Sequence, residues 1–170
     1  MPMLDVHIPA GALDDDAERE LLATLTDIVL TWEGADPGDP AAQAAAWLFL
    51  HRPALVTVGG REPANPRYKV IATVPEGQWD PERRAGVVAA VTEAVLDAER
   101  GSRPRDPRRV WVFPTEVPEG TWGAGGQIHP LSAIADRLLG DPTAAAEYAH
   151  DRLRRARAER AGEPAEPVSG

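Results

Sequence analysis

One order of strand, turn and helix signals occurs twice along this chain, and the repetition constrains the fold more than any single motif does. The two copies are offset by 66 residues, the separation of Pro9 from Pro75. The same offset also aligns Gly11 with Gly77, Asp14 with Asp80, and Thr26 with Thr92. These identities fall at a strand end, a turn, a helix cap and a helix face, so they indicate a duplicated structural unit.

The first copy has the signals of a strand, a helix and a second strand. Apolar and polar residues alternate from Met3 to Ile8, which is the period of a half-buried strand. Asp14 to Asp16 supply a helix cap and acids for the first turn. Apolar residues then follow at helical spacing over about five turns: Leu21, Leu22, Leu25, Ile28, Val29 and Trp32. After a segment rich in Gly and Pro, Trp47–Leu50 and Leu55–Val58 are predicted as strands.

The second copy repeats this order. Tyr68 to Val74 is predicted as a strand, and Asp80 followed by Pro81 is typical of a helix start, because proline suits the first helical position. The helix then presents an apolar stripe: Val87, Val88, Val91, Val95 and Leu96. A linker rich in Arg and Pro leads to Val110–Phe113, which is predicted as a final buried strand.

These signals predict an α/β (α+β) fold made of two fused β-α-β repeats. A β-α-β crossover makes its two strands parallel and puts its helix on one face of the sheet. Two such units give a four-stranded sheet with both helices on one face. The other face carries Val, Trp and Phe side chains with no helix to cover them, so we expect further copies of the chain to cover it.

The expected domain organisation follows from the same pattern. Residues 1–130 form one domain, with repeats at about 1–60 and 66–128. Residues 131–162 are predicted as a helical extension, and 163–170 as a disordered tail. The apolar residues of the extension are Ile134, Leu138 and Leu139, and helix then continues from Ala144 to Arg160.

Composition narrows the class of partner. The formal charge of −9 argues against a broad nucleic-acid or anionic membrane surface, because both require clustered Lys and Arg. The chain has no cysteine, which excludes disulfides and thiolate metal sites, and its four histidines are too dispersed in sequence to indicate a metal. No signal peptide or membrane-length apolar run is evident, so we expect a cytoplasmic protein that contacts neither membrane nor nucleic acid.

Pro2 is the sharpest candidate for chemistry. A small residue after the initiator Met usually permits removal of Met1, which would leave a secondary amine as the chain terminus. An α-amino group titrates at about 8 in model peptides, so it can act as a base near neutral pH. A proline at the first residue of a strand also fits a purely structural role, because it costs the sheet no hydrogen bond there.

The segment Thr115–Gln127 adds context, since it reads Thr-Glu, spacer, Gly, aromatic, Gly-x-Gly-Gly. This pattern resembles the closing hairpin of the 4-oxalocrotonate tautomerase family. The resemblance extends to Val74–Gly77, to the N-terminal strand that opens with proline, and to His51-Arg52-Pro53. It covers roughly residues 2–128, in a fused two-repeat form similar to cis-3-chloroacrylic acid dehalogenase and malonate semialdehyde decarboxylase.

The resemblance implies a keto-enol tautomerase of the tautomerase superfamily, acting on a small 2-oxo or enol acid. Pro2 would be the general base and acid, Trp122 an aromatic wall of the pocket, and the protein a homotrimer that needs neither cofactor nor metal. Decarboxylation or hydration of a small acid is an alternative, and Asp36 and Asp39 lie where the decarboxylase has a functional acid. A further alternative is an inactive member that binds a small molecule or serves in assembly.

The chain departs from the family at its substrate-binding arginines, whose places are taken by Ala12, Gln78 and Trp111. Dehalogenation by hydration is disfavoured for a similar reason, because the dehalogenase acid would fall in a glycine-rich segment. An anionic substrate would therefore need another cation, and the candidates are Arg52, Arg61 and Arg67, with Lys69 nearby. His51, beside Arg52, is a candidate proton donor. The simpler interpretation is that these arginines are solvated at the surface and that His51 has a structural role.

Overall fold

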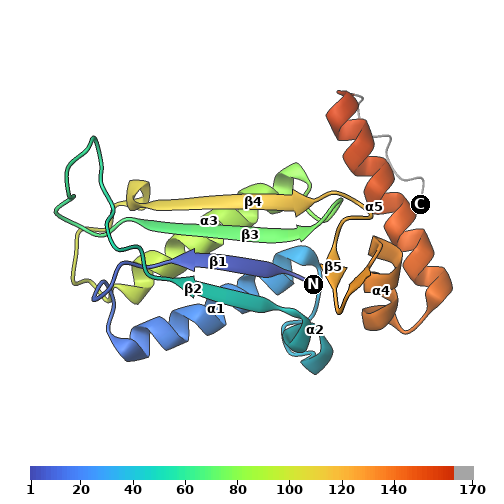
Figure 1. Ribbon diagram of the computed structural model, residues 1–170, viewed down its shortest axis with the longest axis horizontal. Helices are drawn as coiled ribbons and strands as arrows, with labels where there is room; N and C mark the ends of the chain where they lie inside the picture. Colours follow the sequence, from blue (N-terminus) through green and yellow to red (C-terminus); the bar gives the residue numbers. More distant parts are fainter. Residues whose placement is uncertain (163–170) are drawn as a thin grey trace.

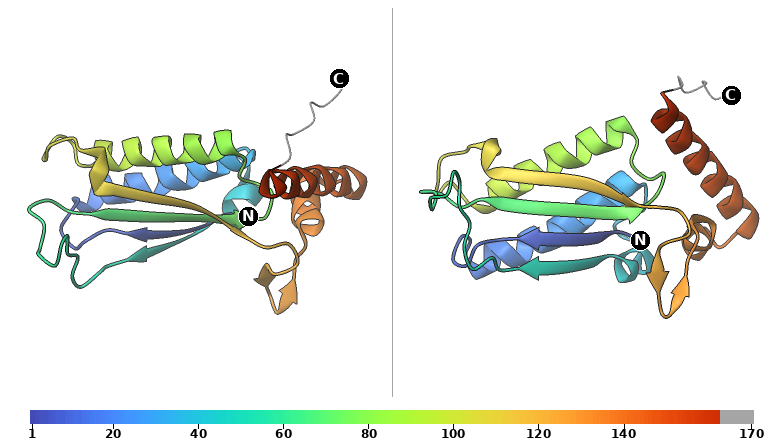
Figure 2. Two further views of the ribbon diagram at one scale, coloured as in Figure 1. Left: turned by 90° about the horizontal axis from the view of Figure 1, so that it is seen from above. Right: turned by 45° about the horizontal axis from the view of Figure 1, so that its top comes forward.

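Two strand-helix-strand units lie side by side in one mixed sheet, and their helices cover the same face (Figures 1 and 2). The computed structural model describes residues 1–162, so the predicted tail at 163–170 lies outside the described residues. The first unit consists of β1 (Met3–His7), α1 (Asp15–Glu33), a short helix α2 (Pro40–Ala45) and β2 (Trp47–His51). The second consists of β3 (Tyr68–Pro75), α3 (Pro81–Ala98) and β4 (Val110–Val117).

The strand order is β2-β1-β3-β4, and each unit pairs its own two strands in parallel. The central strands β1 and β3 are antiparallel, with Met3 opposite Thr73 and His7 opposite Lys69. This arrangement confirms the predicted fold class. It also means that β1 and β3 begin at opposite ends of the sheet, so that equivalent positions of the two copies lie at opposite ends.

The core lies between the sheet and the two long helices. Alternate residues of β1 and β3 face the helices and are buried, as the period of two predicts: Leu4, Val6, Val70, Ala72 and Val74. Both helix caps form as expected, since the Asp14 carboxylate accepts from the Ala17 amide and the Asp80 carboxylate from the Arg83 amide. The helices approach closely where the Trp32 ring packs on Gly86: a Cβ at Gly86 would lie 2.1 Å from that ring.

The opposite face of the sheet is open within the described chain, as predicted. It carries four exposed aromatic side chains: Trp47, Phe49, Trp111 and Phe113. Trp47 and Phe49 alternate along edge strand β2, and Trp111 and Phe113 do so along edge strand β4. None of the described helices is both long enough and apolar enough to span a membrane.

A helical extension follows the sheet and lies beyond the end at which the chain begins (Figure 1). A small hairpin, β5 (Gly123–Ala124) and β6 (Gln127–Ile128), precedes it, and the extension itself consists of α4 (Leu131–Leu139) and α5 (Pro142–Ala161). The last two helices pack against each other. Helix α4 ends at Gly140, whose φ of 64° closes the turn, and the Asp141 carboxylate caps α5.

One local prediction was wrong, and one helix was not predicted. Leu55–Val58 is not a strand: its only ladder contact among the described residues is a bridge between Val58 and Arg61 across a two-glycine turn. The segment is apolar, but the surrounding prolines lack the N–H groups that a ladder needs. The helix that was not predicted, α2, follows the Gly- and Pro-rich segment; Asp39 caps it and Pro40 begins it, which is the same Asp-Pro signal that marks α3.

Candidate active site

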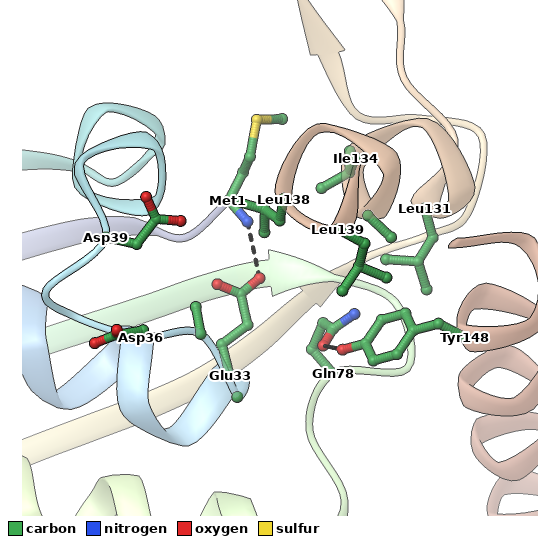
Figure 3. Close-up of a pocket in the computed structure, with 13 residues that line it drawn as sticks. Met1, Glu33, Asp36, Asp39, Gln78, Leu131, Ile134, Leu138, Leu139 and Tyr148 are labelled. Carbon is green, nitrogen blue, oxygen red and sulfur yellow. Dashed lines mark hydrogen bonds and ion pairs between the residues drawn. The ribbon is translucent and has the colours of Figure 1, made fainter. Parts of the chain in front are cut away.

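The chain begins inside a cavity, and its terminal amine is paired there with a buried acid. Pro2 is buried, and its carbonyl accepts a hydrogen bond from the Trp47 amide at 3.1 Å, which fixes the start of β1 against β2. The Met1 amino group donates to Oε1 of Glu33 at 2.9 Å (Figure 3). Glu33 is the last residue of α1 and only 7% exposed. A residue near the first strand and one at the end of the first helix therefore meet.

Glu33 is unusual because its buried carboxylate has few hydrogen-bond partners. Its Oε2 atom is buried without a hydrogen-bond partner in the described chain. It also lies at the C-terminal end of a helix, where the macrodipole disfavours negative charge. A buried charge without a partner is costly, so the terminal ammonium is what makes an ionised Glu33 tolerable here.

The cavity has a volume of about 250 Å³ and walls of two kinds. Helix α4 supplies an apolar wall: Leu131, Ile134, Leu138 and Leu139 (Figure 3). The polar side holds Glu33, Asp36, Asp39, Gln78 and Tyr148. No Arg or Lys side chain is among the described residues that line it. The cavity therefore combines an apolar wall with an acidic one, and among the described residues that line it the only cation is the chain terminus.

Gln78 occupies the turn after β3, which the antiparallel pairing of β1 and β3 brings to the start of β1. Its Oε1 accepts from the Tyr148 hydroxyl at 2.7 Å, and the residue is 2% exposed. That contact leaves the Gln78 amide N–H groups without a hydrogen-bond partner within residues 1–162. Because Tyr148 belongs to α5, the helical extension helps to set the orientation of this side chain.

The wall formed by α4 is held in place through carboxylates. Glu116 accepts from the Gly77 and Trp79 amides, both at 2.9 Å, and so fixes the turn that carries Gln78. Both Glu119 carboxylate oxygens accept from the Leu131 amide at the start of α4. Glu119 is itself positioned by Glu76, whose carboxylate accepts from its amide at 2.7 Å.

Glu76 is also paired with Arg160 of α5. Burial alone would raise the pKa of Glu76, but the Glu119 amide and the Arg160 guanidinium outweigh burial and lower it. The ionised carboxylate thus links the turn after β3 to both the hairpin and the extension.

Of the site residues predicted from the sequence, Pro2 and Trp122 are at this end of the sheet, and Asp36, Asp39 and Gln78, which the sequence also singled out, line the cavity. Trp122 lies half-buried before β5, where its carbonyl accepts from the His129 amide, and it does not line the cavity. The others lie at or beyond the far end of β2. His51 stacks on His7 with ring centroids 4.4 Å apart, and its Nε2 is 2.6 Å from Asp5.

The candidate cations are also elsewhere. Arg52 makes a two-pronged ion pair with Glu18, with nitrogen–oxygen distances of 2.5 and 2.6 Å. Arg61 is exposed in the loop between β2 and β3, and Arg67 donates to backbone carbonyls at the end of that loop. Within one chain, none of the three reaches the N-terminal cavity.

Sequence reasoning missed Glu33 and Tyr148. A signal for Glu33 was present, because the 66-residue offset aligns it with Glu99, another helix-terminal glutamate. Tyr148 lies in the extension, which has no counterpart in the repeat, so nothing in the sequence pointed to it.

Comparison with known proteins agrees with this architecture. No family model and no curated protein sequence matches the chain. Among solved structures it is similar to a native fused 4-OT (TM-score 0.61, 23% identity, 82% of this chain and 99% of that one). It is also similar to the Q0 fused 4-OT symmetric trimer, with a TM-score of 0.60 and 26% identity over 82% of this chain and 99% of that one. A third similar structure is N1, a member of the cis-3-chloroacrylic acid dehalogenase family, with a TM-score of 0.63 and 16% identity over 88% of this chain and 99% of that one. The chain has the fold of the tautomerase superfamily.

Proposed function

We propose that this protein is a keto-enol tautomerase in which the Pro2 amine, exposed by removal of Met1, is the general base and acid, with Glu33 as its partner. One observation carries the proposal: the ammonium of Met1, the residue before Pro2, is paired with a buried carboxylate inside a cavity with an apolar wall. The superfamily fold supports it independently.

Tautomerisation moves one proton between an oxygen and a carbon of the substrate. The neutral Pro2 amine removes the enol O–H proton, and the resulting ammonium returns it to the α-carbon as the C–O bond becomes C=O. Between these steps the ammonium needs an anionic partner in a site of low polarity, and Glu33 can supply one. The free amide N–H groups of Gln78 can donate to the oxygen while it carries negative charge.

The residues that line the cavity also indicate the charge and polarity of the substrate. Within residues 1–162, three carboxylates and no guanidinium line the cavity, so a second negative charge on the substrate would be unfavourable. The apolar wall of α4 suits a hydrophobic substituent. The proposed substrate is therefore a small 2-oxo or enol acid with a single carboxylate and an apolar group, of the phenylpyruvate type.

We propose further that the protein works as a homotrimer. The open sheet face with its four aromatic side chains supports association, and one similar structure is described as a symmetric trimer. Light scattering at micromolar concentration tests this, and a monodisperse monomer would contradict it.

The activity is tested by following ketonisation of the phenylpyruvate enol in the ultraviolet, after mass spectrometry has established the N-terminus. Pro2→Ala keeps an amine but changes its basicity, and Glu33→Gln removes the partner charge; each should lower kcat by at least about tenfold, the scale of a lost acid-base contribution. Asp36→Asn is the matched control, because Asp36 lines the same cavity without touching the amine. A processed wild-type protein that is inert on such enols would contradict the proposal and favour a binding or assembly role.

A further inference from the structure

A second pocket, of about 420 Å³, lies at the other end of the sheet, where β3 begins. Its walls come from the start of β3, the segment before β4 and the loop between β2 and β3, which is at the left of Figure 1. The 66-residue offset makes it the counterpart of the N-terminal cavity, because Tyr68 aligns with Pro2 and Glu99 with Glu33. The duplication thus leaves a pocket beside the first strand of each copy.

The second pocket has none of the proton-transfer groups of the first. Tyr68 lies inside the chain, so no terminal amine exists there. Glu99 is already saturated: its Oε1 accepts from the Tyr68 hydroxyl at 2.8 Å and from Arg109 at 2.6 Å, and its Oε2 accepts from Arg109 as well. Burial, and then the hydrogen bond to Glu99, raise the pKa of Tyr68, which keeps its hydroxyl protonated.

What distinguishes this pocket is positive charge. Four cationic side chains line it, with no carboxylate among the described lining residues: Arg67, Lys69, Arg108 and Arg109. The last two are paired with acids behind the wall. Arg67 donates only to backbone carbonyls, and Lys69, the only lysine of the chain, forms no ion pair within residues 1–162. In a chain of net charge −9, two such cations beside one cavity are unusual.

The charge of Lys69 also affects the pKa of a neighbouring histidine, His7. His7 lies opposite Lys69 in the register of β1 and β3 and also lines the pocket. Burial, followed by the charge of Lys69 and then of His51, lowers the pKa of His7 against the opposing effect of Asp5. The lowered pKa favours the neutral form of His7, so the positive charge considered at the pocket is that of the arginines and Lys69.

We propose that this pocket binds an aromatic carboxylate, at a site separate from the N-terminal cavity and independent of the proposed tautomerase activity. The guanidinium of Arg67 and the ammonium of Lys69 would hold the carboxylate through charge-assisted hydrogen bonds. The ring of the ligand would lie between Trp111, which borders the pocket at the end of the open sheet face, and the apolar side chains Val56 and Val58, so this end of the face must stay accessible in the proposed homotrimer.

The test uses three probes on the full chain: benzoate, which has ring and charge, benzamide, which has only the ring, and acetate, which has only the charge. Binding is followed by the Trp111 indole N–H resonance, assigned by its loss in Trp111→Phe. Benzoate should shift this resonance saturably, and benzamide and acetate should bind at least about tenfold more weakly.

Lys69→Met and Arg67→Met should each weaken benzoate binding by about tenfold. Arg61→Met is the matched control: Arg61 belongs to the same loop, is exposed and does not line the pocket, so its loss should leave the affinity unchanged. The proposal is overturned if benzoate leaves Trp111 unperturbed, if benzamide binds as tightly as benzoate, or if all three variants behave alike.

Discussion

The two ends of the sheet are copies of one structural unit that have acquired opposite chemistry. At the start of β1 a buried glutamate, Glu33, faces a terminal ammonium and keeps one oxygen without a partner. At the start of β3 the equivalent Glu99 is held by a guanidinium and a tyrosine hydroxyl, and neither oxygen is free. The glutamate at this position thus pairs with the chain terminus at one end of the sheet and with a buried arginine at the other. This difference is why we assign proton transfer to the first end only.

The largest expected effect is on the ion pair of Glu99 with Arg109. Arg109→Met removes the cation that is hydrogen-bonded to the buried Glu99 and leaves it the more distant Arg103, at 3.9 Å, so the free energy of unfolding in urea should fall by about 3 kcal/mol. Glu33→Gln should change it by less than about 1 kcal/mol, because a neutral side chain removes an already poorly satisfied charge. Equal losses in the two variants would show that the two glutamates do not differ in the way we describe.

The second-largest expected effect on stability is at the contact between helices α1 and α3, where Trp32 packs on Gly86. Gly86→Ala puts a methyl group into the Trp32 ring, next to the end of α1, and should cost about 1–3 kcal/mol of stability. The offset aligns Trp32 with Ala98, so the second copy has no equivalent contact. Combining Gly86→Ala with Trp32→Leu should recover part of the loss. Strictly additive losses would show that the clash is not the cause.

The two tyrosines of the chain, one at each end, give a smaller and sharper comparison. Tyr148→Phe removes the hydrogen bond that orients Gln78 and should lower kcat for the enol about fivefold with little change in KM, the scale of one hydrogen bond. Tyr68→Phe removes a hydrogen bond at the other end and should lower stability but leave kcat unchanged. If the second variant lost activity as well, the chemistry would not be confined to the first end.

The smallest effect is a difference in acid stability. Glu76 has a lowered pKa in the folded protein, so its contribution to stability is complete above its ordinary value of 4.5 and is lost as pH falls through the lower folded value. The first copy has Ala10 at this position. Glu76→Gln should therefore flatten the decline of unfolding free energy below pH 4.5, and Arg160→Gln should do so partly. An unchanged decline in both would remove Glu76 from the account.

Much of this fold could be predicted because its signals are local. The alternation of Leu4, Val6 and Ile8, and the caps Asp14 and Asp80, depend only on neighbouring residues, and the structure has them as expected. Pairing between distant segments could not be predicted in this way. Leu55–Val58 has the composition of a strand but no strand beside it.

The candidate site depends even more on distant contacts. The pairing of Arg52 with Glu18, 34 positions away in sequence, could not be predicted from local pattern, and whether Arg52 or His51 touches substrate stays a prediction. Glu33 has a surface-like sequence context, and only its contact with an amine 32 positions away gives it a candidate role. Whether Arg61, Arg67 or Trp122 touches substrate stays a prediction.

The central claim, that the Pro2 amine performs the proton transfer, is tested most directly by the activity of chains that differ only in Met1. A methionine aminopeptidase converts a preparation that retains Met1, and mass spectrometry gives the fraction that begins at Pro2 in each sample. We predict that the rate of ketonisation of the phenylpyruvate enol rises in proportion to that fraction and extrapolates to the uncatalysed rate when every chain retains Met1. Equal activity with and without Met1 would contradict the account.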